Sequence, residues 1–282
     1  MILVFGRTGQ VARELARTGL DAVFLGREAA DLSDPETCAA AIRSHSPGLV
    51  INAAAYTAVD AAETDEEAAR QVNAAAPGVM ARAAAERDVP FLHISTDYVF
   101  DGSGTAPWRP DDPVRPLGAY GRTKAEGEAA IRDAGGRHLI LRTSWVFSGH
   151  GTNFVKTMLR LSEARDSLRI VADQVGGPTA AADIARTCVA LGEQLVNGAE
   201  GGTYHYAGAP DTSWAAFAHE IFRQSGRQVA VEDIPTVDYP TPALRPLNSR
   251  LDCTALERDF GIGRPDWRAS LGHVLKELGV HA

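Results

Sequence analysis

The sequence contains few cysteines and no long apolar run. Its three cysteines, Cys38, Cys188 and Cys253, lie far apart and form no Cys-x-x-Cys pair, which is typical of reduced thiols in a cytoplasmic protein. No apolar stretch approaches the roughly 20 residues that a membrane-spanning helix needs. Residues 1–5 begin a strand pattern without the basic and apolar regions of a signal peptide. We therefore expect a cytoplasmic protein without a membrane partner.

Positive charge is also scarce, because 28 lysines and arginines face 36 acidic residues and the net charge is −8. This balance disfavours non-specific binding to nucleic acid, so we expect no nucleic-acid partner. Metal-ligand spacings such as His-Glu-x-x-His are missing as well. The 282 residues, 45% of them hydrophobic, suffice for a nucleotide-binding domain with a smaller lobe.

Short apolar stretches alternate with helical patterns through the first half of the chain. The expected strands are residues 1–5, 22–25, 49–51, 89–94 and 138–142. This alternation predicts an α/β fold with a Rossmann-type doubly wound parallel sheet and a smaller C-terminal substrate-binding lobe. We place residues 1–146 and 168–208 in the NAD(P)-binding Rossmann domain, and residues 147–167 and 209–282 in the lobe.

A turn with two glycines joins the first strand to the following helix. It reads Gly6-Arg7-Thr8-Gly9-Gln10-Val11-Ala12 and has the spacing Gly-x-x-Gly-x-x-Ala. Strand, glycine turn and helix in this order are typical of a dinucleotide site, where the backbone approaches a pyrophosphate at the helix start. The predicted cofactor residues are Gly6, Gly9, Gln10 and Val11; a plain tight turn is the alternative.

The end of the second expected strand bears on the choice of cofactor. An acidic residue there usually accepts the ribose 2′-hydroxyl of NADH, whereas an arginine suits the 2′-phosphate of NADPH. The chain reads Gly26-Arg27 at this point, so Arg27 favours NADPH, while the adjacent Glu28 keeps NADH as the alternative. Asp31 and Leu32 follow closely and are predicted to border the adenine.

Small residues follow the third expected strand. The run is Ala53, Ala54, Ala55, Tyr56 and Thr57. Small side chains let a flat group pass close to the backbone, so we predict that this run lines the cofactor site; simple close packing is the alternative. Thr96 lies just beyond the C-terminal end of the fourth expected strand, and ligands of open α/β sheets bind beyond such ends. It is therefore placed to hydrogen-bond a substrate oxygen.

Tyr120 and Lys124 are four residues apart and would share one face of a helix. A free tyrosine has a pKa of about 10, and a neighbouring ammonium group lowers that pKa by favouring the tyrosinate. A shift from about 10 to about 7 corresponds to roughly 4 kcal/mol. The pair thus suits protonation of a carbonyl oxygen when the carbonyl receives a hydride. Chance occurrence is the alternative, but Thr96 and the glycine turn fall at the same sheet edge.

Several longer segments carry a family pattern. They are GRTGQV (6–11), NAAAYTAVD (52–60), STDYVF (95–100), YGRTK (120–124), RTSWVF (142–147), DQVGGPT (173–179) and RPLNSRL (245–251). With them the chain resembles the extended short-chain dehydrogenase/reductases and, within these, the dTDP-4-dehydrorhamnose reductases. The glycine turn and Tyr-x-x-x-Lys mark only the superfamily, whereas STDYVF, TSWVF and RPLNSRL are far more specific to the reductases.

The resemblance implies an NAD(P)-dependent oxidoreductase with NADPH or NADH as its cofactor, and Arg27 favours NADPH. The activity would be reduction of the C4 keto group of dTDP-4-dehydro-β-L-rhamnose to give dTDP-L-rhamnose. Tyr120 would donate the proton, Lys124 would tune Tyr120 and hold the nicotinamide ribose, and Thr96 would polarise the carbonyl. The implied substrate contacts are Thr96, Asp97 and Trp145 to the sugar and Arg245 and Asn248 to the nucleotide.

Other interpretations stay open at the level of the sequence. A reductase of another nucleotide-linked 4-keto-deoxy sugar and a non-catalytic NADP-binding regulatory subunit are the alternatives. The expected partner is a small-molecule nucleotide sugar, and a homodimer is compatible with the family. Some members hold Mg²⁺ at a dimer interface, where Glu14 falls at one ligand position. The other ligands do not match cleanly, so we predict no metal.

Overall fold

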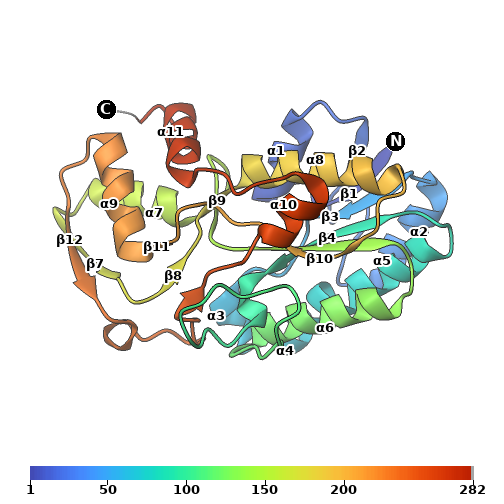
Figure 1. Cartoon of the computed structure of the whole chain (residues 1–282), viewed down its shortest axis with the longest axis horizontal. Helices are drawn as coiled ribbons and strands as arrows, with labels where there is room; N and C mark the ends of the chain where they lie inside the picture. The colour runs from blue at the N-terminus through green and yellow to red at the C-terminus, as the bar shows by residue number, and fades with distance from the viewer. Residues whose placement is uncertain (281–282) are drawn as a thin grey trace.

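A computed structural model describes residues 1–280 of the chain (Figure 1). Within these residues, the central sheet has the order β10-β5-β4-β3-β1-β2, and every neighbouring pair is parallel. The strands are β1 (Ile2–Phe5), β2 (Ala22–Leu25), β3 (Leu49–Asn52), β4 (Phe91–Thr96), β5 (His138–Thr143) and β10 (Gly202–His205). The inner strands are mostly apolar and buried, because helices cover both faces of the sheet.

Helices pack on both faces, above and below the sheet in Figure 1. One face carries α2 (Pro35–His45), α5 (Ala76–Ala85) and α6 (Ala119–Asp133), and the other carries α1 (Gln10–Arg17), α8 (Ala181–Val196) and α10 (Thr254–Phe260). Phe5 joins the core with Met80, whereas its neighbour Val4 joins the core with Leu191, as expected for alternating strand residues. The predicted doubly wound Rossmann-type fold is confirmed.

Between β3 and β4 the chain forms short helices before α5. They are α3 (Val59–Ala62), α4 (Glu66–Arg70) and the π-helix η1 (Gln71–Ala75). Pro77 offers no N–H group to the carbonyl of Asn73, four residues earlier, and the helix widens at this point. The Asn73 carbonyl faces α6, where a Cβ at Gly127 would lie 2.0 Å from it. Glycine therefore lets the two helices approach closely.

A smaller lobe lies beside the sheet, on the left in Figure 1. The remaining strands are β6 (Val146–Phe147), β7 (Ser167–Val171), β8 (Val175–Gly176), β9 (Thr179–Ala180), β11 (Thr212–Ser213), β12 (Ala230–Ile234) and β13 (Asn248–Ser249). The helices of the lobe are α7 (Phe154–Ser162), α9 (Trp214–Ser225) and α11 (Trp267–Glu277), with the 3-10 turn η3 (Thr236–Asp238). A second 3-10 turn, η2 (Asp97–Val99), follows β4 of the central sheet and packs on α6. The lobe core centres on Phe217, whose ring contacts Phe147 and Trp267. No helix in the described range 1–280 is long and apolar enough to cross a membrane.

The predicted domain boundary needs correction. The prediction places residues 168–208 in the Rossmann domain, but β7 pairs with β12, and β8 pairs with β11 and β13, outside the central sheet. From this range, β10 joins the sheet and α8 covers it. Conversely, α10 lies in the range predicted for the lobe, yet Leu256 and Phe260 pack against the central sheet on the same face as α1 and α8. The boundary differs because an apolar run in the sequence predicts a strand but does not reveal which strand pairs with it, or in which sheet.

The strand order reverses between β1 and β3. The chain leaves β1 toward β2 on one side, and leaves β3 toward β4 on the other. In doubly wound folds, ligands bind in the crevice at this switch point, beyond the carboxyl ends of the strands. Gly6 follows β1 there and Ala53 follows β3, so the fold brings two of the predicted cofactor segments together.

Candidate active site

A cavity of about 1030 Å³ opens at the switch point. Its wall combines residues 6–11 after β1, 25–28 and 30–32 after β2, 53–55 after β3, 94–98 around the end of β4, and 151–153 before α7. Tyr120, Lys124 and Trp145 also line it. Ligand pockets usually measure about 300–1,000 Å³, so this cavity has room for a large ligand.

The turn after β1 presents backbone rather than side chains to the cavity. Gly6 has a φ of +103°, and a Cβ there would lie 3.2 Å from the carbonyl carbon and oxygen of Ala53, so a side chain would strain the turn. Gly9 precedes α1, and no side chain within the described range caps this helix start. The first N–H groups of the helix are therefore available to an anion. Gly6, Gly9, Gln10 and Val11 all lie on the wall.

The Gln10 side chain has a structural task of its own. Its Oε1 accepts hydrogen bonds from Ser148 Oγ at 2.8 Å and from Asn153 Nδ2 at 2.9 Å. These bonds hold the loop whose residues 151–153 form part of the wall. The sequence motifs do not indicate that this loop joins the site, because Ser148 and Asn153 lie 138 and 143 positions after Gln10 in the sequence.

The residues predicted near the adenine lie on the wall but differ in exposure. The Arg27 side chain is 86% exposed, and its ion pair with Asp31 spans 3.9 Å. A backbone hydrogen bond lowers the pKa of Asp31. Leu32 is buried against the core of the sheet. Arg7 and Glu28, which are not among the predicted cofactor-binding residues, also line the cavity here and form an ion pair of 2.6 Å.

The small residues after β3 line the cavity with one exception. Ala53, Ala54, Ala55 and Thr57 belong to the described wall, whereas Tyr56 does not. The Tyr56 ring packs with Tyr120 against small residues of α3, α4 and α6. Asn73 holds the Tyr56 backbone from both sides, accepting from its N–H at 2.8 Å and donating to its carbonyl at 3.1 Å. The position of Tyr56 therefore does not support its predicted place on the wall.

Tyr120 and Thr96 lie side by side on the cavity wall. Thr96 ends β4, and its hydroxyl lies close enough to the Tyr120 phenol to lower the pKa of that phenol in part. The same hydroxyl accepts from Tyr98 N at 3.2 Å and donates to Asp97 Oδ1 at 3.2 Å. The Tyr98 ring meets the Tyr120 ring edge-on, with centroids 5.5 Å apart. The two hydroxyl groups are thus fixed side by side from different elements.

Lys124 lies one turn further along α6 and is 1% exposed. Its Nζ donates to the Ile94 carbonyl at 2.8 Å and contacts His93 Nε2 at 2.9 Å. The other ring nitrogen of His93 contacts Asn52 Nδ2 at 3.1 Å. Burial and the charge of Lys124 hold the pKa of His93 well below its usual value, so this ring is neutral. The sequence does not suggest this partner for Lys124, because His93 follows no motif.

The chain itself does not lower the pKa of Tyr120. Burial raises the pKa to about 12, although the hydrogen bond with Thr96 lowers it in part. Burial also lowers the pKa of Lys124 to about 8, against the effect of Glu128. The predicted direction of the Tyr120 shift is wrong for the chain alone. The Lys124 ammonium is bound to Ile94 and His93, and desolvation of the phenol dominates.

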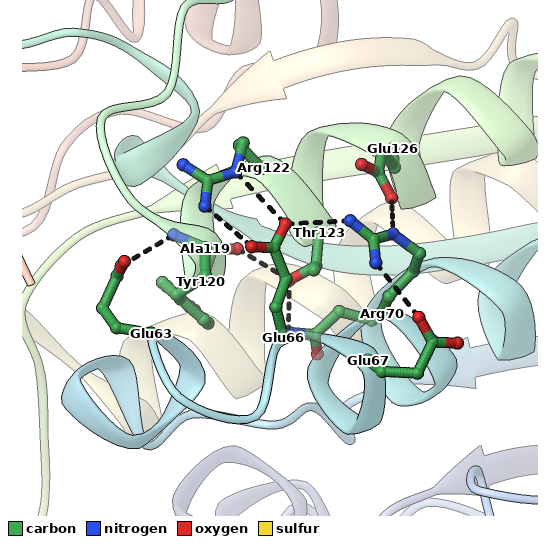
Figure 2. Close-up of polar contacts among 10 residues, drawn as sticks. Glu63, Glu66, Glu67, Arg70, Ala119, Tyr120, Arg122, Thr123 and Glu126 are labelled. Carbon is green, nitrogen blue, oxygen red and sulfur yellow. Dashed lines mark hydrogen bonds and ion pairs between the residues drawn. The ribbon is translucent and has the colours of Figure 1, made fainter.

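Charged side chains of the neighbouring helices anchor the start of α6 (Figure 2). Gly118 offers no side-chain cap, and the Ala119 N–H instead donates to Glu63 Oε1 at 2.7 Å. Arg122 binds both carboxylate oxygens of Glu66, at 3.2 Å and 2.8 Å. Each exposed ion pair contributes little stability alone. Together, Glu63 and Glu66 hold the first turn of α6 through Ala119 and Arg122, and this turn carries Tyr120.

Asp97 and Trp145 border the cavity close to Thr96. Burial raises the pKa of Asp97 to about 6. Within the described chain, Asp97 Oδ2 and Thr143 Oγ1 are buried and have no hydrogen-bond partner, which favours a polar ligand beside them. Trp145 has a φ of +49° and stacks on Trp214 with centroids 3.6 Å apart. This conformation is strained for a bulky residue, and it keeps the indole on the wall.

Arg245 and Asn248 lie outside the described cavity wall. Arg245 forms an ion pair of 2.8 Å with Asp60 of α3 and so connects the lobe to the central domain. Asn248 donates to the Ala106 carbonyl at 2.8 Å and accepts from Arg250 Nη1 at 3.0 Å. These contacts give both residues a structural task, and their contact with a substrate nucleotide stays a prediction.

One group with metal-ligating side chains lies away from the cavity. Glu14, His150 and Glu277 offer ligand atoms within 4.8 Å of one another. Arg17 already occupies this group, with Nη1 at 2.7 Å from Glu277 and 3.3 Å from Glu14. The guanidinium compensates both carboxylates, and the group acts as a charged link between α1 and α11. The absence of a metal site stays a prediction.

Comparison with known proteins identifies the family. Residues 1–280 match the family model described as RmlD substrate binding domain. The chain belongs to this family. It is also 44% identical over 287 residues to the dTDP-4-dehydrorhamnose reductase of Sinorhizobium fredii, covering 98% of this chain and 97% of that protein.

Two solved structures extend the likeness of this RmlD-type chain. The dTDP-4-dehydrorhamnose reductase of Clostridium acetobutylicum gives a TM-score of 0.93 at 36% identity and covers 99% of each chain. The enzyme of Bacillus anthracis, crystallised in complex with NADP, gives a TM-score of 0.92 at 29% identity and covers 98% of each chain. The resemblance and the oxidoreductase class predicted from the motifs are confirmed.

Proposed function

We propose that this protein reduces the C4 keto group of dTDP-4-dehydro-β-L-rhamnose with NADPH to give dTDP-L-rhamnose. The observation that carries the proposal is that Tyr120, Thr96 and Lys124 line the same cavity as the glycine turn. The extensive identity to a named dTDP-4-dehydrorhamnose reductase supports the substrate. The NADP complex of the Bacillus anthracis enzyme supports the cofactor.

The cavity wall fits a nicotinamide dinucleotide. The free N–H groups at the start of α1 suit a pyrophosphate, and Gly6 and Ala53 leave the backbone open to close approach. Lys124, on the wall near Tyr120, would hold the nicotinamide ribose. When bound, NADPH supplies the hydride for the keto carbon.

Tyr120 is the proposed proton donor. Its raised pKa of about 12 keeps the phenol protonated at neutral pH, as a donor to the sugar oxygen must be. Thr96 now donates its hydroxyl hydrogen to Asp97. Rotation of that hydroxyl would direct the hydrogen to the substrate oxygen and polarise the carbonyl. Two donors would then face O4, with Tyr120 giving up its proton.

Lys124 acts on the state that follows proton transfer. Its pKa of about 8 keeps the ammonium charged at neutral pH, and it shares a helix face with Tyr120. A positive charge on this face stabilises the tyrosinate that remains after the proton has left. The hydrogen bonds to Ile94 and His93 keep the ammonium in place.

The sugar would bind between Tyr120 and Trp145. The indole offers an apolar face on the wall, fixed by its stacking on Trp214. Asp97 Oδ2 lacks a partner within the described chain and is an acceptor for a sugar hydroxyl. Arg245 and Asn248 would act on the nucleotide side, which requires Arg245 to exchange its pairing with Asp60 for the ligand.

The direct test follows NADPH fluorescence after mixing the purified protein with dTDP-4-dehydro-β-L-rhamnose. We expect NADPH to be consumed in proportion to the dTDP-L-rhamnose formed. Turnover confined to another nucleotide-linked 4-keto-deoxy sugar would favour the first alternative. NADPH binding without turnover of any such sugar would favour the regulatory subunit.

Thr96→Val is expected to lower kcat by about 100-fold, because it removes one donor to the developing oxyanion but keeps the side-chain shape. Steady-state kinetics at saturating NADPH measure the effect. Thr64→Val serves as the control, since Thr64 is exposed and its hydroxyl bonds only locally, to the Ala61 carbonyl. Equal kcat values for Thr96→Val and wild type would remove Thr96 from the mechanism.

Gly121→Ala is expected to displace α6 and with it Tyr120. A Cβ at Gly121 would lie 2.2 Å from the Tyr98 carbonyl oxygen and 2.9 Å from Pro116 Cβ. A shift of about 1 Å at a catalytic group lowers the rate by roughly 100-fold, and overpacking costs about 1–3 kcal/mol of stability. Kinetics and thermal unfolding measure both effects.

Gly48→Ala is the matched control for this change, because the nearest atom to its Cβ would be the Met1 carbonyl oxygen at 3.9 Å. It should retain both activity and Tm. Wild-type kinetics in Gly121→Ala would show that the position of α6 is not critical for the reaction.

A further inference from the structure

Arg7 and Glu28 form an ion pair on the cavity wall, on loops other than the elements that carry Thr96, Tyr120 and Lys124. Arg7 belongs to the turn after β1 and Glu28 follows β2, and both line the cavity. Arg7 Nη1 lies 2.6 Å from Glu28 Oε1, and the two side chains are 62% and 64% exposed. An exposed pair of this kind contributes little stability, so either partner is free to turn to a ligand.

Gly26 allows Glu28 to take this position. A Cβ at Gly26 would lie 2.4 Å from Glu28 Oε2 and 2.7 Å from Oε1, so the carboxylate folds back over the backbone at the end of β2. In dinucleotide-binding folds, the group at the ribose 2′ position is read at the end of this strand. The absence of a side chain at position 26 thus places a carboxylate where the 2′ group is expected.

Arg27 is placed differently. Its side chain is 86% exposed, compared with 62% for Arg7, and its guanidinium is 3.9 Å from Asp31. The sequence singles out Arg27 because of its position after the strand. The structure instead points to Arg7 and Glu28, whose guanidinium and carboxylate already contact each other on the cavity wall.

We propose that the Arg7–Glu28 pair, rather than Arg27, determines the choice between NADPH and NADH. The Arg7 guanidinium binds a 2′-phosphate, for which its planar fork of donors is suited. The Glu28 carboxylate accepts a hydrogen bond from a free 2′-hydroxyl and repels a phosphate. With both groups present, the site accepts either cofactor. This inference rests on the proposed use of a nicotinamide dinucleotide by the same cavity.

Isothermal titration of the full-length protein with NADPH and with NADH tests the proposal without relying on turnover. One charge-assisted hydrogen bond gained or lost changes affinity by about tenfold. We therefore expect Glu28→Gln to raise the NADPH/NADH affinity ratio about tenfold and Arg7→Gln to lower it about tenfold. Arg13→Gln, an exposed position on α1 outside the described wall, is the charge-matched control.

The outcomes separate this inference from the proposed function. Opposite shifts in Glu28→Gln and Arg7→Gln, with an unchanged ratio in Arg13→Gln, support the proposal. An unchanged ratio in both pair variants, or a larger drop in Arg27→Gln than in Arg7→Gln, overturns it while the proposed function stands. Failure of the wild type to bind either dinucleotide overturns both. Circular dichroism confirms that each variant is folded.

Discussion

Tyr120→Phe is expected to lower kcat by about 100-fold to 10,000-fold, the usual contribution of a positioned general acid. The substitution removes the phenolic hydroxyl and keeps the ring, so the contact with the Tyr98 ring is retained. The hydroxyl lies beside Thr96, and both residues line the cavity. NADPH binding should therefore change little while turnover is lost.

Stopped-flow kinetics at saturating cofactor measure the loss of turnover in Tyr120→Phe separately from any change in NADPH binding. Tyr204→Phe is the matched control, because it removes a phenolic hydroxyl that donates to Asp259 on the surface. The control should turn over like the wild type. If Tyr120→Phe retained the wild-type kcat, another group would have to supply the proton.

Glu128→Leu is expected to lower the free energy of unfolding by about 3–5 kcal/mol, because it leaves the buried Arg142 charge unpaired. Glu128 and Arg142 are 0% and 2% exposed. Arg142 donates to the two carboxylate oxygens at 2.8 Å and 2.6 Å, and Ser95 Oγ donates to Oε1 at 2.6 Å. The pair supports β4 directly before Thr96, so its loss should also reduce activity.

Urea denaturation of matched variants tests this second prediction. Glu126→Leu is the control on the same helix, because Glu126 pairs with Arg70 at the surface, at 2.8 Å, and exposed pairs are worth about 0–1 kcal/mol. Arg142→Met added to Glu128→Leu should restore part of the stability, because no buried charge then remains. Equal losses for Glu126→Leu and Glu128→Leu would contradict the importance of burial.

The same pair predicts a dependence on pH. Burial would raise the pKa of Glu128, but the hydrogen bond and charge of Arg142 outweigh it and leave the pKa lowered. A carboxylate with a lowered folded-state pKa stabilises the fold above its usual titration range and loses this effect as the pH falls through the folded pKa. The stability difference between wild type and Glu128→Leu should therefore shrink as the pH falls below about 4.

Local patterns account for much of the fold and of the cofactor site. The apolar run before Gly6 and the helix after Gly9 are adjacent in sequence, so the strand, turn and helix can be recognised without tertiary information. The sheet edge then follows from topology, and it brings Tyr120, Thr96 and the glycine turn to one cavity. These residues share an edge because parallel strands all end there.

Long-range contacts account for what the sequence does not reveal. The strand β7 is recognisable, but its partner β12 begins about sixty residues later and no local pattern links them. Lys124 is recognisable beside Tyr120, but its contact with His93 depends on how α6 packs on β4. Desolvation of Tyr120 is likewise a property of the packed cavity, which explains why its pKa rises where the isolated pair suggests a fall.

The central claim is that a hydride from the cofactor reaches the sugar C4 while Tyr120 protonates O4. The most direct measurement uses NADPH deuterated at the transferred nicotinamide position together with dTDP-4-dehydro-β-L-rhamnose, and locates the label in the product by NMR. The account predicts dTDP-L-rhamnose with one deuterium at C4 and an equal amount of oxidised cofactor. Deuterium at any other carbon, or a product formed without cofactor oxidation, would contradict it.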